Sequence, residues 1–454
     1  MGRHHPSLLG VVVTAIAVSF PICTDAAPIE HDRTTIEGGL ARVNAARSGA
    51  DADPLALEEA LTALGDAYLA ASQYTAAEAA YVEAVRSAEQ HGGGETQRVL
   101  APLTGLGTTL AKAGHHLDAI PHLQRAVAIT RAQLGMFDLR QQDVLKTLAG
   151  SLTALNRQPE AQDAMVYRVR VAEKTYGEGN PKVIPWLCDL GNWFADIGKT
   201  PEARMTFYTA LNIVGTTEAL NAPIIVEPLR GIARAWMLRP SYPDAWRRPP
   251  RPTLCPSLEF NPLPPPGCTA ARRDAIGRLA LEPRTLHQEG EDALKRALRI
   301  VESDPDSPMQ TRIETLLQMG DWYQIKDSPS EALTYYQRAW QLIRATPKLP
   351  DSAATALNVP LRVYYPTPQI VAYVPQVAAV DTQSHYVQLE FTVAADGSVH
   401  NARIVDHDTR ELYARDVLKA VRDSRFRPKF VDGQPVAATG ITYREVFWTG
   451  KPRE

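Results

Sequence analysis

Apolar residues of this chain recur with a 42-residue period between residues 58 and 225, as the steps from Leu61 to Leu103 to Leu145 show. Within each unit they stand three and four positions apart, the spacing that lines one face of an α-helix. Each unit holds two such stretches, which predicts successive antiparallel helix pairs. Equivalent positions of the first four units are Leu61, Leu103, Leu145 and Leu187; Tyr68, Leu110, Leu152 and Phe194; and Ala77, Ala119, Ala161 and Ala203.

The same pattern continues beyond residue 225 with one interruption. A fifth unit begins at Leu229 and is broken by residues 240–283, which carry eleven prolines, before its second helix resumes near Gly290. A sixth unit runs from Leu316 to Ala339. We therefore predict a helical array over 58–345 with a proline-rich insertion at about 240–283.

The repeat positions resemble those of the tetratricopeptide repeat (TPR), which implies an α-solenoid of helix pairs. The usual period is 34 residues, so the helices or turns here must be longer by about eight residues. In TPR arrays the first helix of each pair lines a concave groove. The resemblance implies a peptide-binding groove that presents Asp66, Thr108, Lys146, Asn192 and Asp321.

A different period governs the end of the chain. Residues 386–394 alternate between apolar and polar, Asp396-Gly397 favours a tight turn, and 399–405 predict a returning strand. Asp408, three residues before Glu411, predicts a capping box at the start of a helix. That helix has an apolar stripe at Ala414, Val417, Leu418 and Val421, and residues 441–448 predict a last strand. Residues 385–454 therefore predict a small α+β domain of β-β-α-β order.

This segment resembles the C-terminal domain of the TonB family over about residues 385–448. The resemblance rests on LEFTVAADGSV (389–399), ARIVD (402–406), FRP (426–428), GQPV (433–436) and ITYREVF (441–447). In that family an extended partner segment adds as a strand to the edge formed by the last strand, in the manner of β-augmentation. The resemblance implies edge-strand contacts at Ile441, Thr442, Tyr443, Arg444 and Val446, and weaker ones at Tyr365, Pro366 and Gln369.

The first residues have the pattern of an export signal. A short positive region at Arg3, His4 and His5 precedes the apolar run 8–20, and small residues at 24–26 offer a cleavage site. We expect 1–26 to be a signal peptide, 27–57 a lead-in to the repeats, and the mature protein to be periplasmic. The alternative is an uncleaved inner-membrane anchor facing the periplasm.

The net charge bears on the class of partner, and the cysteines bear on a disulfide. A net charge of −3 disfavours nucleic acid as a partner. Cys255 and Cys268 bracket part of the proline-rich insertion, so in an oxidising compartment we expect a disulfide between them. Cys188 is expected to be a helix-packing residue. Residues 346–384 carry several prolines and predict an extended linker.

No motif of catalysis stands out. Phosphate-binding glycine loops, His-Glu-x-x-His and Gly-x-Ser-x-Gly are missing from the sequence. His115, His116 and His122 favour a solvated turn over a metal site, and the basic run at 422–429 favours either solvent or an acidic partner. We therefore expect no enzyme activity, cofactor or metal.

Two functions fit these patterns. One is a periplasmic adaptor that binds proteins or peptides, such as an outer-membrane transporter or another envelope protein, through the repeats and through the TonB-like domain. The alternative is a membrane-anchored energy transducer for TonB-dependent transport across the outer membrane. In the TonB family the anchor helix carries a histidine within the membrane, whereas the apolar run 8–20 contains none.

Overall fold

The computed structural model describes residues 10–12, 30–48, 53–214, 222–238, 286–366 and 381–451. These residues form two compact units that divide within one helix. One unit extends to Leu190, and the other holds the residues from Gly191 onward together with the short strand at 10–12. Each unit is described by itself. Within the described residues, no helix has both the length and the apolar character needed to cross a membrane.

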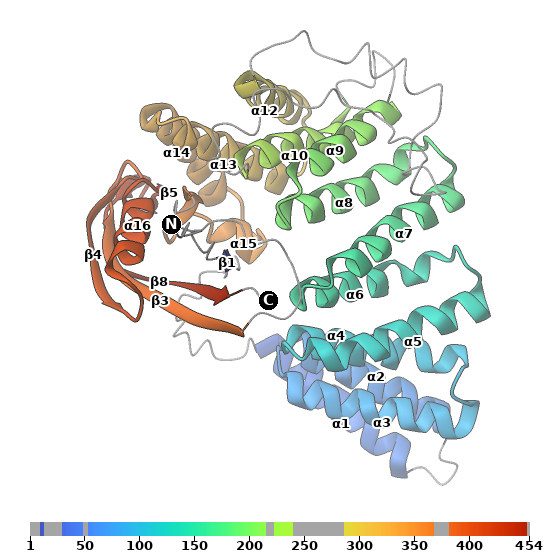
Figure 1. Cartoon of the computed structure of the whole chain (residues 1–454). Helices are drawn as coiled ribbons and strands as arrows, with labels where there is room; N and C mark the ends of the chain where they lie inside the picture. Colours follow the sequence, from blue (N-terminus) through green and yellow to red (C-terminus); the bar gives the residue numbers. More distant parts are fainter. Residues whose placement is uncertain are drawn as a thin grey trace, which may run out of the picture. The chain divides into compact units, whose positions relative to one another are not determined.

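The first unit is a succession of antiparallel helix pairs (Figure 1). Its elements are α1 (Glu30–Ser48), α2 (Pro54–Ala70), α3 (Tyr74–Gly92), α4 (Leu100–Lys112), α5 (His116–Leu134), α6 (Gln142–Ala154), α7 (Gln158–Tyr176) and the start of α8 (Ile184–Asp196). The predicted pairs are confirmed. The lead-in at 27–57 is more than a connector, because α1 packs Val43 against Leu61 and Leu64 of α2.

The extra length of the repeat lies in two places. The second helices α3, α5 and α7 each have 19 residues. A 3₁₀ turn precedes each following first helix, at Gln97–Val99, Leu139–Gln141 and Pro181–Val183. Long second helices and these turns together account for the 42-residue period.

Glycines allow neighbouring helices to approach closely around Tyr81. Its side chain is fully buried, and a Cβ atom added to Gly65 of α2 or Gly105 of α4 would lie 2.7 Å or 2.3 Å from its ring. Contacts that short do not occur for real side chains, so only glycine fits at both positions without movement of the ring. The Tyr81 ring therefore joins the first pair to the second.

The second unit continues the helix pairs. It contains α9 (Thr200–Val214), α10 (Val226–Met237), α12 (Leu286–Ser303), α13 (Met309–Ile325) and α14 (Pro329–Ala345). α10 and α12 pack together as the predicted fifth pair, although the insertion that separates them in sequence lies outside the described residues. Glu291 links α12 to α13 by accepting hydrogen bonds from Tyr323 at 3.0 Å and from Lys326 at 2.6 Å.

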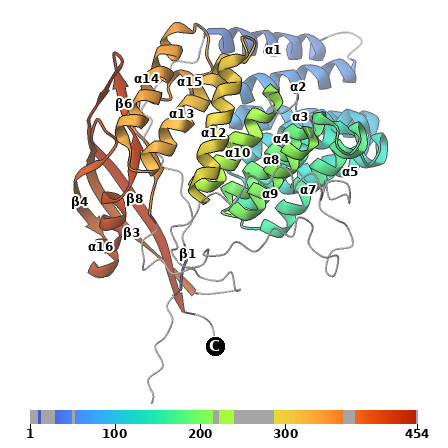
Figure 2. The ribbon, with the colours of Figure 1, turned by 90° about the horizontal axis from the view of Figure 1, so that it is seen from above.

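The same unit ends in an antiparallel sheet covered by one helix (Figure 2). Its order is β1-β8-β3-β4. The elements of this region are β1 (Gly10–Val12), β2 (Leu361–Tyr364), β3 (Asp381–Val393), β4 (Val399–His407), α16 (Glu411–Arg422), β5 (Arg425–Arg427), β6 (Lys429–Val431), β7 (Gln434–Val436) and β8 (Ala438–Lys451). β2 pairs with β5, and β6 pairs with β7, in two separate two-stranded sheets. The predicted β-β-α-β order is confirmed, and β5, β6 and β7 are added between α16 and β8.

The core of this domain matches the two predicted periods. Alternate residues of β3 from Val387 to Val393 are buried against Ala414, Val417 and Val421 of α16. The register of β3 with β4 shifts twice, between Gln388 and Leu389 and again before Thr392, as the broken alternation of the second strand suggested. Apolar burial between the sheet and α16 therefore fixes the orientation of β3.

Two sequence-based expectations for this region are wrong. Asp408 does not cap α16: the helix has Arg410 as its N-cap with no side-chain bond, and the Asp408 carboxylate accepts the Tyr386 N–H at 2.6 Å instead. The linker predicted at 346–384 is folded in its first half. It contains α15 (Asp351–Ala354) and β2, and Leu357, 2% exposed, accepts the Phe430 N–H at 2.8 Å.

Candidate protein-binding surfaces

The outer edge of β8 is the first candidate surface. β8 pairs antiparallel with β3 from Ala438 to Lys451. On its other side, the only neighbour in the described part of the chain is β1, which pairs with residues 448–450. Residues 438–447 thus leave the outward backbone groups of β8 without a strand partner among the described residues.

The predicted edge residues alternate along this strand. Thr442 and Arg444 are exposed, whereas Ile441, Tyr443 and Val446 are half-buried. The Arg444 guanidinium lies 3.8 Å from the ring centre of Tyr386 on the neighbouring strand. One face of β8 therefore serves the core, and the strand is held in place along its inner side.

A buried cluster supports the strand from the core side. Glu445 is 5% exposed, and its burial raises the pKa of its carboxyl group. Tyr443 donates a hydrogen bond to this carboxyl group. Arg362 lies within β2, and its guanidinium is 4.4 Å from the ring centre of Tyr365 and 4.6 Å from that of Tyr443. The β2 segment and β8 are therefore packed together.

Tyr365, for which the resemblance implied a weak partner contact, belongs to this packing within the domain. Tyr365 packs edge-on against Tyr443 with ring centres 6.4 Å apart, and burial raises the pKa of its hydroxyl. Its ring therefore supports β8 from within the domain instead of offering a separate contact to a partner. Pro366 is the last described residue of this segment, and Gln369 lies outside the described residues.

The predicted groove positions are the second candidate, and they are described unit by unit. Asp66 of α2 is exposed and accepts a hydrogen bond from Tyr81 at 2.6 Å. Thr108 of α4 is half-buried. Lys146 of α6 is exposed and lies 3.2 Å from the Asp189 carboxylate. These three residues stand on first helices, as the repeat resemblance implies.

Asn192 of α8 lies in the second unit. Its side-chain oxygen accepts a hydrogen bond from Arg234 of α10 at 3.2 Å, and Arg234 also binds Asp196. The polar groups on neighbouring first helices are thus partly engaged with one another. A partner that binds here would have to displace these hydrogen bonds or use donors and acceptors that they leave unused.

Asp321 is not available as a groove residue, which corrects that prediction. It is 8% exposed, and the Arg427 side chain from β5 binds it through Nε at 3.0 Å and Nη2 at 2.6 Å. Tyr336 donates a further hydrogen bond to Asp321 at 2.8 Å. The chain's own C-terminal domain therefore occupies this position.

Further contacts fix the C-terminal domain on α13. Gln324 donates a hydrogen bond to the Asp396 carbonyl at 2.8 Å, and Arg425 binds Asp327 at 2.8 Å and 3.0 Å. The rings of Tyr336 and Phe430 meet edge to face, 6.5 Å apart. Part of the basic run at 422–429 therefore meets acidic residues of the last repeat.

These contacts take the place of a seventh helix pair. In the first pair the ring of Tyr81 is covered by Gly105 of the following pair. Tyr336 holds the equivalent position in the last pair, and its ring is covered by Phe430 and by the Arg427 guanidinium, 5.9 Å from the ring centre. The TonB-like domain thus caps the repeats.

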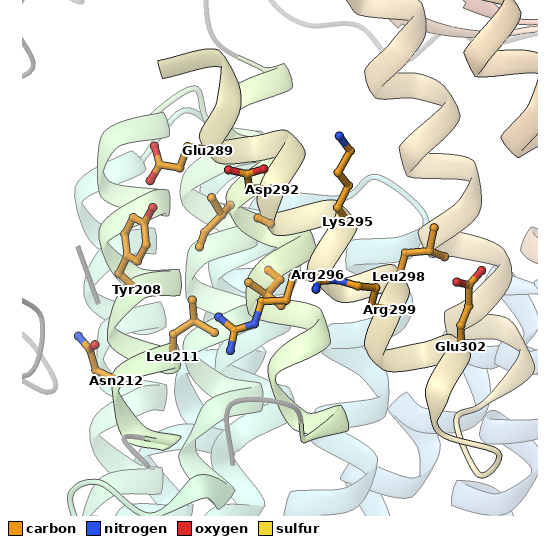
Figure 3. A pocket seen from close by; sticks show the side chains of 13 residues that line it. Tyr208, Leu211, Asn212, Glu289, Asp292, Lys295, Arg296, Leu298, Arg299 and Glu302 are labelled. Carbon is orange, nitrogen blue, oxygen red and sulfur yellow. The ribbon is translucent and has the colours of Figure 1, made fainter. Parts of the chain in front are cut away.

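A pocket between α9, α10 and α12 is the third candidate. Its volume is about 490 Å³, and Figure 3 shows α9 and α12 lining it from two sides. Three carboxylates and three cations line it together with apolar residues: Glu289, Asp292, Glu302, Lys295, Arg296 and Arg299. Lys295 pairs with Glu291, and Glu302 pairs with Arg338. Lys295 and Glu302 are thus engaged in ion pairs with residues outside the pocket lining, and the lining has no nucleophile paired with a base.

Neither the described cysteine nor any cluster of potential metal ligands forms a further candidate site within the described residues. Cys188 is buried in α8 and is not in a disulfide, as expected for a packing residue. The predicted Cys255–Cys268 disulfide lies outside the described residues and stays a prediction. Where the structure describes the chain, no three His, Cys, Asp or Glu side chains are arranged to hold a metal ion.

Comparisons with known proteins agree with both regions. Residues 372–445 match the family model of the Gram-negative bacterial TonB protein C-terminal region, and residues 56–132 match that of the tetratricopeptide repeat. No curated protein matches the chain.

Two solved structures are among those similar to the chain. BtubC (BKLC) from P. vanneervenii is 14% identical over 71% of this chain and 96% of that chain, with a TM-score of 0.38. TPR-like repeats of a kinesin light chain from Podosopora anserina are 17% identical over 56% of this chain and 99% of that chain, with a TM-score of 0.40.

The chain therefore carries TPR repeats followed by a TonB-type C-terminal domain. TPR repeats indicate protein–protein interaction, and a TonB-type domain indicates a role connected with the cell envelope. Both are interaction domains rather than enzymes.

Proposed function

We propose that this protein is a periplasmic adaptor in which the TPR groove holds one protein and the TonB-type domain binds another by strand addition at β8. The observation that carries the proposal is the outer edge of residues 438–447, which has no strand neighbour among the described residues. An unpaired strand edge offers a row of N–H and C=O groups to an extended segment.

The structure of β8 favours this mode of binding. Its inner side is paired with β3 from Ile441 to Lys451 without interruption, so the strand is already ordered before a partner arrives. Binding to an ordered edge costs less conformational entropy than binding to a loop. The adaptor lacks β1, which lies within the signal peptide 1–26, so the outer edge of residues 448–450, where β1 pairs antiparallel, is open to the same partner.

The test uses prolines at two adjacent positions of β8, Ile441 and Thr442. Neighbouring strand residues turn their N–H groups to opposite sides, so one proline removes an outward group and the other removes a bond to β3. We expect the outward proline variant to keep its circular dichroism spectrum and to lose the envelope proteins that the parent captures. The matched controls are Ile441→Ala and Thr442→Ala, which remove the same side chains and keep the N–H groups.

Capture is measured by quantitative mass spectrometry of proteins bound from a detergent-solubilised envelope fraction. Arg444→Ala should retain the partner, because strand addition depends on backbone groups. A correctly folded outward proline variant that captures the same proteins as the parent would exclude strand addition at this edge.

A second role, as an energy transducer, is favoured by the TonB-type match at 372–445. It requires residues 1–26 to remain as a membrane anchor. Cell fractionation separates the two roles: the adaptor is a soluble periplasmic protein that begins near Ala27, whereas the transducer remains with the inner membrane and keeps its first residues.

A further inference from the structure

The first and last helix pairs share one polar arrangement. In the last pair, Tyr336 donates a hydrogen bond to Asp321, which lies 15 residues before it. In the first pair, Tyr81 donates a hydrogen bond to Asp66 over the same separation of 15 residues. Equivalent positions of the intervening pairs are not acidic; they are Thr108, Gly150, Asn192 and Arg234. The Asp–Tyr couple therefore marks only the two ends of the array.

The two Asp–Tyr couples differ in the hydrogen-bond partners of the aspartate and in its exposure. The Asp321 carboxylate uses Oδ1 for Tyr336 and both oxygens for the fork of Arg427, and it is buried. The Asp66 carboxylate uses Oδ1 for Tyr81, and it is exposed. No cation among the described residues pairs with Asp66. The first pair thus presents the same acceptor without the arginine that fills it in the last pair.

We propose that Asp66 is a binding site for an arginine side chain presented by a segment of a partner protein. The inference deepens the adaptor proposal by giving the chemistry of the groove's partner, and it does not depend on the edge of β8. A planar guanidinium matches a carboxylate through two parallel hydrogen bonds, which a lysine ammonium cannot form. Arg427 on Asp321 is the precedent within this chain.

The acceptor at Asp66 is held in place before a ligand arrives. Tyr81 is fully buried, and its ring lies against Gly65 and Gly105, so its hydroxyl is fixed. The hydrogen bond at 2.6 Å then restrains the carboxylate. A fixed acceptor loses less freedom on binding, which favours specific recognition over loose attraction. Because Gly105 already covers the ring, the partner needs to supply only the arginine.

The probe is a library of random 12-residue peptides displayed on phage and selected on the full chain. We expect enrichment of arginine at one position of the selected peptides. A selected peptide is then labelled, and its affinity is measured by fluorescence anisotropy. Replacing its arginine with lysine should weaken binding about tenfold, because the paired hydrogen bonds are lost.

Three variants separate a built site from general attraction to negative charge. Asp66→Asn should weaken binding about tenfold or more. Tyr81→Phe keeps the ring and removes only the hydroxyl that orients Asp66, so it should weaken binding about threefold. Glu59→Gln removes an equal charge from the same exposed face of α2, two helical turns away, and should leave the affinity unchanged.

Several outcomes would overturn the proposal. They are a selection without arginine enrichment, equal affinity for lysine, unchanged affinity in Asp66→Asn, or an equal loss in Glu59→Gln. Circular dichroism melting of each variant confirms that α2 and α3 are intact. The proline variants of β8 should bind the selected peptide like the parent, so failure of strand addition and failure of this site are distinguishable.

Discussion

The buried ion pair between Arg427 and Asp321 should determine whether the C-terminal domain stays on the last repeat. Arg427→Met removes the cation and leaves Asp321 with the Tyr336 hydrogen bond alone. Asp321→Asn removes the charge and leaves the guanidinium near the Ala356 carbonyl, at 3.4 Å. Each variant therefore leaves one buried charge without its partner.

The magnitude follows from burial and geometry. The two side chains are 10% and 11% exposed, and two hydrogen bonds join them at 3.0 Å and 2.6 Å. Removing one member of a buried ion pair typically costs about 3–5 kcal/mol, whereas replacing both by uncharged groups costs much less. The double variant Asp321→Asn/Arg427→Met should therefore be more stable than the sum of the two single losses by about 2 kcal/mol or more.

Hydrogen exchange of the full chain measures this interface directly. The Phe430 N–H bonds to the Leu357 carbonyl, so its protection reports whether β6 remains in place. We expect each single variant to lower the free energy of opening at Phe430 by about 3 kcal/mol, while the core amides of β3 keep their protection. A loss under about 0.5 kcal/mol in both single variants, or strictly additive losses in the double variant, would refute this account of the interface.

Two carboxyl groups, half-buried Glu291 and buried Glu445, should change stability with pH in opposite directions. Burial alone would raise the pKa of Glu291, but hydrogen bonds from Lys295, Lys326 and Tyr323 outweigh it and lower that pKa to about 2 from 4.5. The stability it contributes is present above pH 4.5 and is lost as the pH falls toward 2. The full shift corresponds to about 3 kcal/mol, but solvent screens a half-buried group, so Glu291→Gln should cost about 2 kcal/mol or less at pH 7. Thermal melts should show that this difference from the parent shrinks as the pH falls toward 2. Burial raises the pKa of Glu445, so its contribution is present below pH 4.5 and is lost as the pH rises through the raised value. Glu445→Gln should therefore melt higher than the parent at pH 8 and match it at pH 4; a lower melting temperature at pH 8 would contradict this.

The repeats were predictable because their packing repeats with the sequence. Buried apolar and small residues return at fixed intervals wherever one helix crosses the next, as Gly65 and Tyr81 do in the first pair. The core of the C-terminal domain was predictable for the same reason: alternate residues of β3 face α16. Local periodicity carries this information in both regions.

The docking of the C-terminal domain was not predictable from such patterns. Asp321 and Arg427 are 106 residues apart, and nothing local distinguishes a filled groove position from an open one. The folded part of the predicted linker escaped notice because α15 has only 4 residues and β2 only 4. One signal was present: the arginines at 425 and 427 could have been matched with Asp321 on α13 and with Asp327, which directly follows that helix.

Hydrogen exchange at β8 in the presence of a captured partner tests the adaptor proposal most directly. Strand addition predicts that the outward N–H groups of residues 441–447, which alternate along the regularly paired part of β8, become protected when the partner binds. The N–H groups already bonded to β3 should change little. Unchanged exchange along the outer edge of β8 in a complex shown to be intact would contradict strand addition and leave the TonB-type domain as the cap of the helical repeats.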